Sequence, residues 1–378
     1  MIFFKLGCTS FGGPVAHLGY FHREFVQQRK WFTEVEYTEL LALCHFLPGP
    51  ASSQVGMAIG YRQQGVLGSL IAFVGFTLPS VLLMVMAALL LQSSALTETL
   101  NGVLHAMKLL AVAVVADAVW GMAKKICITR VKTAITLITA VTMLVVPGLS
   151  SQLTVIFLAG LVGAVFLAQS GSSVQPLVEK GSSWLSPVCL VVFAGLLLGL
   201  PWLASYSPSL ELVDTFYRAG GLVFGGGHVV LPMLQAEPLV QSAISSEQFL
   251  TAYSFAQAVP GPMFTIASYL GVAYQGSWMD GLIATAAIFL PGWLIVIATL
   301  SLWPKIKSIS LLSGAMQGVV AATVGLLVAA LYQPVFVSAV LSPSDMAIVL
   351  SVWALLCIAK LPVWSVVIAV ATFGGVFL

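Results

Sequence analysis

Long apolar segments limit what this chain can fold into more than any other feature of its sequence. A helix that crosses a bilayer needs about 20 consecutive apolar residues, and many segments approach or reach this length. The clearest are residues 66–91, 101–123, 133–146, 153–168 and 283–302. Hydrophobic residues make up 59% of the chain and charged residues only 7%, far from the balance of a soluble protein. The sequence predicts an all-α polytopic membrane protein.

Several other classes of protein are excluded. A formal charge of +2, with the basic residues scattered among loops, argues against nucleic-acid binding. No cysteine or histidine pair has metal-site or redox spacing, and no glycine-rich phosphate-binding loop is present. The sequence therefore predicts no cofactor, no ATP-driven pump and no enzyme. The first apolar segment has no basic leader or cleavage site, so it is interpreted as mature structure.

One unit occurs twice in the chain. Phe11-Gly12-Gly13 recurs as Phe224-Gly225-Gly226, and Leu47-Pro48-Gly49-Pro50 recurs as Val259-Pro260-Gly261-Pro262. Further glycines and prolines repeat at nearly the same offset. The predicted domains are a first transporter repeat at 1–168, a polar linker with one unpaired apolar segment at 169–212, and a second repeat at 213–378.

The number of apolar segments predicts how the two units are oriented. Each unit holds six of them, so a single spacer helix would start the second unit from the opposite side of the membrane. The two repeats are therefore predicted to have inverted topology. Lys and Arg favour cytoplasmic loops, and they sort onto one face only if the first two segments of each unit turn back within the membrane. This sorting favours broken or re-entrant helices.

The repeated glycine and proline motifs are the first candidates for a substrate site. Pro48-Gly49-Pro50 and Pro260-Gly261-Pro262 are predicted to break helices, because proline lacks an N–H and glycine weakens a helix. The freed backbone groups need a cavity or protein partners, and a half-helix N-terminus attracts an anion. Phe11-Gly12-Gly13-Pro14 and Phe224-Gly225-Gly226-Gly227-His228 suit the same role. The alternative is that these motifs are only kinks and close helix contacts.

Two cations, Lys5 and Arg218, stand at matching positions, each six residues before its Phe-Gly-Gly motif. Burying an unpaired charge in a membrane is costly, so an ionisable residue there is a functional candidate. Both cations are predicted to contact an anionic substrate. The alternative is that Lys5 snorkels to the interface and that Arg218 pairs with Asp214, one helical turn earlier.

Four further polar residues complete the candidate set. Asp117 is predicted to couple transport to protons, because a carboxylate in a transporter can exchange a proton; the alternative is a place near the interface. His45 and His228 flank the motifs and can bind an anion when protonated, or they are ordinary helix contacts. Gln257 holds the place of His45 in the second unit and is predicted to face the same cavity.

In their order and spacing, these motifs resemble the chromate ion transporter family in its long, two-domain form. The resemblance extends over nearly the whole chain and includes Arg29-Lys30-Trp31 after the first motif. It implies a secondary transporter in the inner membrane that exports chromate, by proton-coupled exchange or a related secondary mechanism, and gives chromate resistance. Members often begin with a short hydrophilic leader, so it stays open whether this N-terminus is complete.

Two alternatives to chromate export stay open. Sulfate has the shape and charge of chromate, so sulfate or another oxyanion is the competing cargo. An anion channel is the competing mechanism. The expected partners are the oxyanion and the lipid bilayer, and a homodimer is left open.

Overall fold

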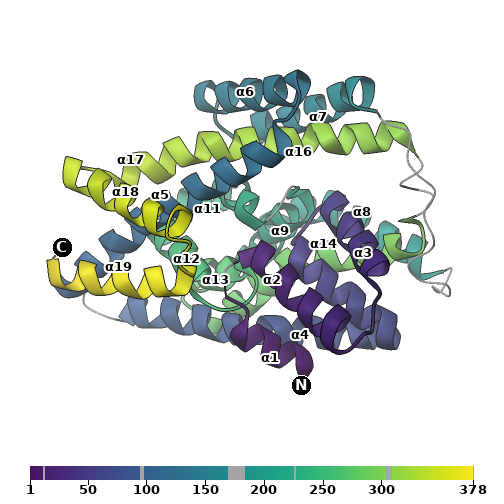
Figure 1. Cartoon of the computed structure of the whole chain (residues 1–378), viewed down its shortest axis with the longest axis horizontal. Coiled ribbons are helices and arrows are strands. Elements are labelled where there is room, and N and C mark those ends of the chain that lie inside the picture. The colour runs from purple at the N-terminus through teal and green to yellow at the C-terminus, as the bar shows by residue number, and fades with distance from the viewer. Residues whose placement is uncertain are drawn as a thin grey trace.

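The described part of the chain consists of helices and their connections (Figure 1). The computed structural model describes residues 1–11, 13–93, 98–168, 184–224, 227–303, 306 and 309–377, among which there is no β-strand. Six described helices are long and apolar enough to cross a membrane: Ala51–Leu91, Asn101–Ile126, Leu149–Phe166, Leu185–Tyr206, Trp278–Leu300 and Ser310–Ala339. The predicted all-α polytopic membrane fold is confirmed.

The first half of the chain runs through eight described elements. They are α1 (Ile2–Thr9), α2 (Gly13–Phe21), the π-helix η1 (His22–Gln28), α3 (Glu34–Phe46), α4 (Ala51–Ser93), α5 (Glu98–Ile126), α6 (Arg130–Val145) and α7 (Leu149–Phe166). Helix α4 is kinked at Gln64 and Gly65, where the glycine has a φ of 62°. It therefore acts as two helices in sequence.

The second half follows the same order after a spacer, α8 (Leu185–Leu203) and η2 (Ala204–Tyr206). Its elements are α9 (Pro208–Leu222), η3 (Gly227–Val229), α10 (Val230–Gln235), α11 (Pro238–Ala243), α12 (Ser246–Ala258), η4 (Met263–Thr265), α13 (Ile266–Gln275), α14 (Trp278–Leu300), α16 (Ser310–Ala330), η5 (Leu331–Phe336), α17 (Val337–Ala339), α18 (Pro343–Cys357) and α19 (Val363–Phe377). The unpaired apolar segment of the sequence is thus a helix, α8. The polar stretch before it, residues 169–183, lies outside the described residues.

Helices end at the repeated motifs, as predicted. Helices α3 and α12 have the same length, begin with a capping box and end just before their Pro-Gly-Pro sequence. Their C-terminal caps, Leu47 and Val259, are extended, with ψ of 151° and 149°. Proline disfavours the helical conformation in the residue before it, so the same local sequence stops both helices at the same place.

The last two helices of each half pack against the other half. Helices α6 and α7 lie along α16, whereas α18 and α19 lie along α5 (Figure 1). Glycines permit both contacts: a Cβ on Gly163 of α7 would overlap the carbonyl of Gly314, and a Cβ on Gly374 of α19 would overlap that of Gly102. The halves are therefore interlocked. Their inverted orientation in a membrane and the predicted domain boundaries stay predictions.

Candidate functional site

The two Pro-Gly-Pro breaks are each held by the opposite half of the chain. The Gly49 N–H donates to the Val223 carbonyl at 2.7 Å, and the Gly261 N–H donates to the Ser10 carbonyl at 3.0 Å. Val223 and Ser10 are the residues directly before the two Phe-Gly-Gly motifs. Backbone groups freed by a helix break in a membrane need such partners. Each Pro-Gly-Pro break therefore meets the residue before the Phe-Gly-Gly motif of the other half, and these contacts form the crossing between the halves.

Glycine is required at both breaks. Gly49 and Gly261 have φ of 117° and 106°, a region that side chains with a Cβ rarely adopt. A Cβ on Gly261 would lie 2.7 Å from Ser80 Oγ, and one on Gly49 would lie 3.2 Å from the Gly292 Cα. At both breaks a larger residue would therefore be strained and would crowd its neighbours.

Two buried polar side chains brace the crossing from the first half. Gln54 donates through Nε2 to the carbonyls of Pro48 at 2.7 Å and Gly292 at 3.2 Å. His17, which is fully buried, donates through Nε2 to the Ser10 carbonyl at 3.2 Å. Both bind backbone groups in the motifs or close to them, and neither was predicted from the sequence.

A cavity of about 490 Å³ lies beside this crossing. Elements from both halves line it, because α3, the start of α4 and α5 come from the first half and η3 and α16 from the second. Of the predicted residues, it brings together His45, Gly49, Asp117, Gly227 and His228. Two other cavities of the described structure include none of the predicted residues.

The cavity is suited to an anion. Lys125 lines it together with the two histidines and Asp117, so its wall carries one permanent positive charge. Burial lowers the pKa of His45 and that of His228, the latter to about 4, so near neutral pH both act as neutral hydrogen-bonding groups. Ala51 and Ser52, the first residues of α4, also line it. Amides in the first turn of a helix have no partner within the helix and lie at the positive end of its dipole. Such an N-terminus is a common anion-binding element.

The sequence analysis missed Lys125 as a site residue and used it only for membrane topology. Asp117, Gly121 and Lys125 follow one another at intervals of four on α5 and all line the cavity. Residues four apart share a face of a helix. The spacing from Asp117 was therefore a signal, but only the position of α5 shows that this face meets the motifs.

His228 is held by two polar residues of α12. The Tyr253 hydroxyl lies 3.0 Å from His228 Nδ1, and the Gln257 Nε2 lies 3.4 Å from the same atom. When tyrosine donates this bond, the histidine carries its proton on Nε2. Gln257 is thus adjacent to the cavity through His228, whereas its repeat mate His45 lines the cavity directly.

Asp117 contacts the last part of the second half. Its Oδ1 accepts a hydrogen bond from the Cys357 thiol at 2.9 Å. Lys108, which precedes it on α5, pairs instead with Glu247 at 2.8 Å. Among the described residues of α5, Lys125 is the only cation that lines the cavity together with Asp117.

The other predicted residues lie outside the cavity wall. Lys5 is exposed, and Arg218 is paired with Asp214 and Glu237. Phe11 follows α1, and Gly13 and Pro14 are the first two residues of α2. The prolines of the two breaks, Pro48, Pro50, Pro260 and Pro262, are buried at the crossing. Gly12, Gly225 and Gly226 lie outside the described residues. For all of these, contact with the cargo stays a prediction.

The chain is similar to known chromate transporters. A model of the chromate transporter family matches residues 1–164 and 210–376. The probable chromate transport protein of Synechococcus elongatus is 27% identical over 330 residues, or 85% of this chain and 80% of that protein. The chromate transport protein of Cupriavidus metallidurans is 26% identical over 385 residues, or 99% of this chain and 91% of that protein. No solved structure matches this chain significantly.

The family match covers both halves and leaves out the region of α8. The six apolar helices agree with a multi-pass membrane protein, and the family is one of transporters and not of enzymes. This chain therefore belongs to the chromate transporter family.

Proposed function

We propose that this protein is a secondary transporter that exports chromate across the inner membrane, driven by the proton gradient, and that it gives chromate resistance. The observation that supports this proposal most directly is the cavity whose wall contains Lys125, His228 and the N-terminus of α4, beside the Pro48-Gly49-Pro50 break. The curated relatives from Synechococcus and Cupriavidus bear the name of chromate transport proteins.

In this proposal the cavity holds the oxyanion. The Lys125 ammonium and the first amides of α4 neutralise its charge, and His228 and His45 add hydrogen-bond donors. The motif glycines let the backbone approach the anion without side chains between. Asp117, about two turns before Lys125 on the same face of α5, is the proposed proton-exchanging group at the cavity, because its carboxylate repels the oxyanion when ionised and does not when protonated.

Chromate flux into inside-out vesicles tests the proposal. We expect saturable uptake of labelled chromate that depends on an imposed proton gradient, with sulfate as a weaker competitor. Uptake that does not saturate and ignores the gradient would indicate an anion channel. If sulfate displaces chromate at equal concentration or below, the cargo is sulfate.

We further propose that the two halves are inverted repeats in the membrane. The support is the equal order of their elements around α8 and the matched backbone bonds at the two breaks. An inverted pair presents an equivalent path to each face, which is how many secondary transporters alternate access.

Cysteine labelling measures this orientation. Ile128, between α5 and α6, and Leu341, between α17 and α18, are exposed and hold corresponding places in the two halves. In a variant whose native cysteines are replaced by alanine, we expect Ile128→Cys and Leu341→Cys to react with an impermeant reagent from opposite sides. Reaction of both from one side would refute the inversion.

A further inference from the structure

A buried cluster of three charged residues lies apart from the cargo cavity. Arg218 on α9 binds Glu237 at 2.8 Å and Asp214 at 3.0 Å, both through Nη2. The Glu237 side chain is 0% exposed and that of Asp214 5% exposed. Glu237 lies between the short helices α10 and α11, outside the six candidate spans. The function proposed above leaves this cluster without a role.

The cluster has more negative than positive charges. Two carboxylates share one guanidinium, so it carries a net negative charge when all three groups are ionised. Asp214 Oδ1, Glu237 Oε1 and Arg218 Nε are buried and have no hydrogen-bond partner in the described structure. An uncompensated buried charge costs several kcal/mol, whereas one added proton makes the cluster neutral. Its composition therefore favours the uptake of a proton.

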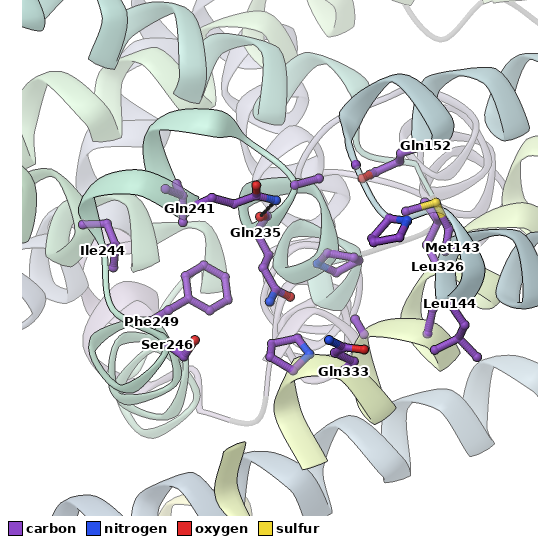
Figure 2. A pocket seen from close by; sticks show the side chains of 18 residues that line it. Met143, Leu144, Gln152, Gln235, Gln241, Ile244, Ser246, Phe249, Leu326 and Gln333 are labelled. Carbon is purple, nitrogen blue, oxygen red and sulfur yellow. Dashed lines mark hydrogen bonds between the residues drawn. The ribbon is translucent and has the colours of Figure 1, made fainter. Parts of the chain in front are cut away.

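A pocket is lined by the chain segment that carries Glu237, although Glu237 itself does not line it. It has a volume of about 360 Å³, and Gln235, Ala236, Val240 and Gln241, which flank Glu237 in the sequence, line it. Figure 2 shows Gln235 and Gln241 on one side of this pocket and Gln333 on another. Neutral amides can hold water molecules without binding an ion, so this pocket can bring water as far as the residues that flank Glu237.

Helix α9, which carries Arg218, connects the cluster to the cargo cavity. Arg218 lies in the last two turns of α9, and the chain after α9 passes through Val223 into the motif that ends at His228. The Val223 carbonyl accepts the hydrogen bond of Gly49, and both Gly49 and His228 line the cavity. A shift of α9 on loss of one ion pair would therefore act on the cavity wall.

We propose that Glu237, held between Arg218 and Asp214, is a proton-binding site that couples proton movement to cargo movement, separate from Asp117 at the cavity. When Glu237 takes up a proton from the pocket, Arg218 keeps only Asp214 as an ionised partner. When the proton leaves, the Glu237 ion pair forms again. This inference rests on the proposed proton-coupled transport.

The electrostatics agree with this role at neutral pH. Burial raises the pKa of Glu237 to about 7, with the Arg218 charge opposing the shift and the Asp214 charge adding to it. Glu211 on α9 is the other charged group that acts on the cluster, through Asp214. Helix α9 itself carries one further titratable group, Tyr217. The elements packed against α9 carry three more, which are Cys189 on α8, Tyr206 on η2 and Asp280 on α14.

Transport and infrared titration of the full-length protein test the proposal. In liposomes with a trapped pH indicator, we expect the wild-type rate of chromate-driven proton movement to change about tenfold between about pH 6 and pH 8, as for one group with a midpoint near 7. Glu237→Gln should make chromate flux nearly independent of pH and lower the proton movement about tenfold or more. The carboxyl band that titrates in this range should disappear from its infrared spectrum.

Asp214→Asn separates a proton site from a merely structural ion pair. It removes the charge that raises the pKa of Glu237, so the midpoint of both the flux profile and the infrared band should move about one unit toward acid. Glu247→Gln is the control, because Glu247 pairs with Lys108 and is 59% exposed. It should leave the midpoint unchanged.

Each outcome decides the inference. A Glu237→Gln protein that keeps the wild-type pH dependence and proton movement overturns it, as does an unshifted midpoint in Asp214→Asn. If the wild-type protein moves no chromate, the proposed function fails. The infrared titration then still decides the proton site, since a band that titrates near neutrality and is lost in Glu237→Gln supports it and its absence refutes it.

Discussion

Replacing Gly49 by valine is expected to reduce chromate flux to background. At a φ of 117° a residue with a Cβ is strained by about 1–3 kcal/mol. The new Cβ would also lie 2.9 Å from the Gln54 Nε2 and 3.2 Å from the Gly292 Cα, and overpacking of this kind costs about 1–3 kcal/mol more. The Gly49 N–H would move away from the Val223 carbonyl, and the cavity wall would move with it.

Gly195→Val is the matched control for this substitution. Gly195 lies in α8, and a Cβ there would have no atom within 4 Å. Flux of labelled chromate into vesicles should be measured together with the amount of protein in the membrane, so that loss of transport is separated from loss of insertion. Near-normal flux in Gly49→Val would contradict the requirement for glycine at the break, whereas Gly195→Val should transport normally.

Replacing Lys125 by glutamine is expected to lower the efficiency of chromate transport by about tenfold to a hundredfold. The estimate follows from the loss of a hydrogen bond to a charged group, which contributes about 1.5–3 kcal/mol. The Lys125 ammonium is the permanent positive charge on the cavity wall. Because it attracts the oxyanion before and during binding, most of the effect should appear as a higher KM. Lys125→Arg, which keeps the charge, should retain most of the transport.

The neighbouring residue provides the control. Lys124 has the same charge and lies in the same turn of α5, but its ammonium stacks 4.4 Å from the centre of the Trp120 ring and does not line the cavity. Lys124→Gln removes the same charge from the end of α5 as Lys125→Gln does, and it should leave the KM for chromate unchanged. Equal effects of the two substitutions would show that the general charge of this face matters, rather than a contact in the cavity.

Much of the local structure was predictable because single residues impose it. Proline and glycine constrain the backbone whatever surrounds them, so the ends of α3 and α12 and the spacer α8 could be placed from the sequence. The internal repeat similarly predicted that corresponding elements would occur in both halves. The inversion and the domain boundaries follow from the same sequence pattern and await their own test.

The partners of the charged residues were not predictable in the same way. The alternative pairing of Arg218 with Asp214 was visible from their spacing on one helix, but the contact with Glu237 depends on how the chain folds back after η3. Asp117 was singled out and Lys125 was not, although they share a helix face. A helix face has a chemical meaning only once its neighbours are known.

The sequence by itself determined the membrane class, the positions of the helix breaks and the doubled order of the elements, because hydropathy, proline and glycine act within a few residues. Only the tertiary structure decided that each Pro-Gly-Pro break is bonded to the other half, that Lys125 and His228 line one cavity, and that Glu237 lies buried against Arg218. Those arrangements join residues far apart in the chain, where packing and the pairing of buried polar groups, rather than local preference, select the partner.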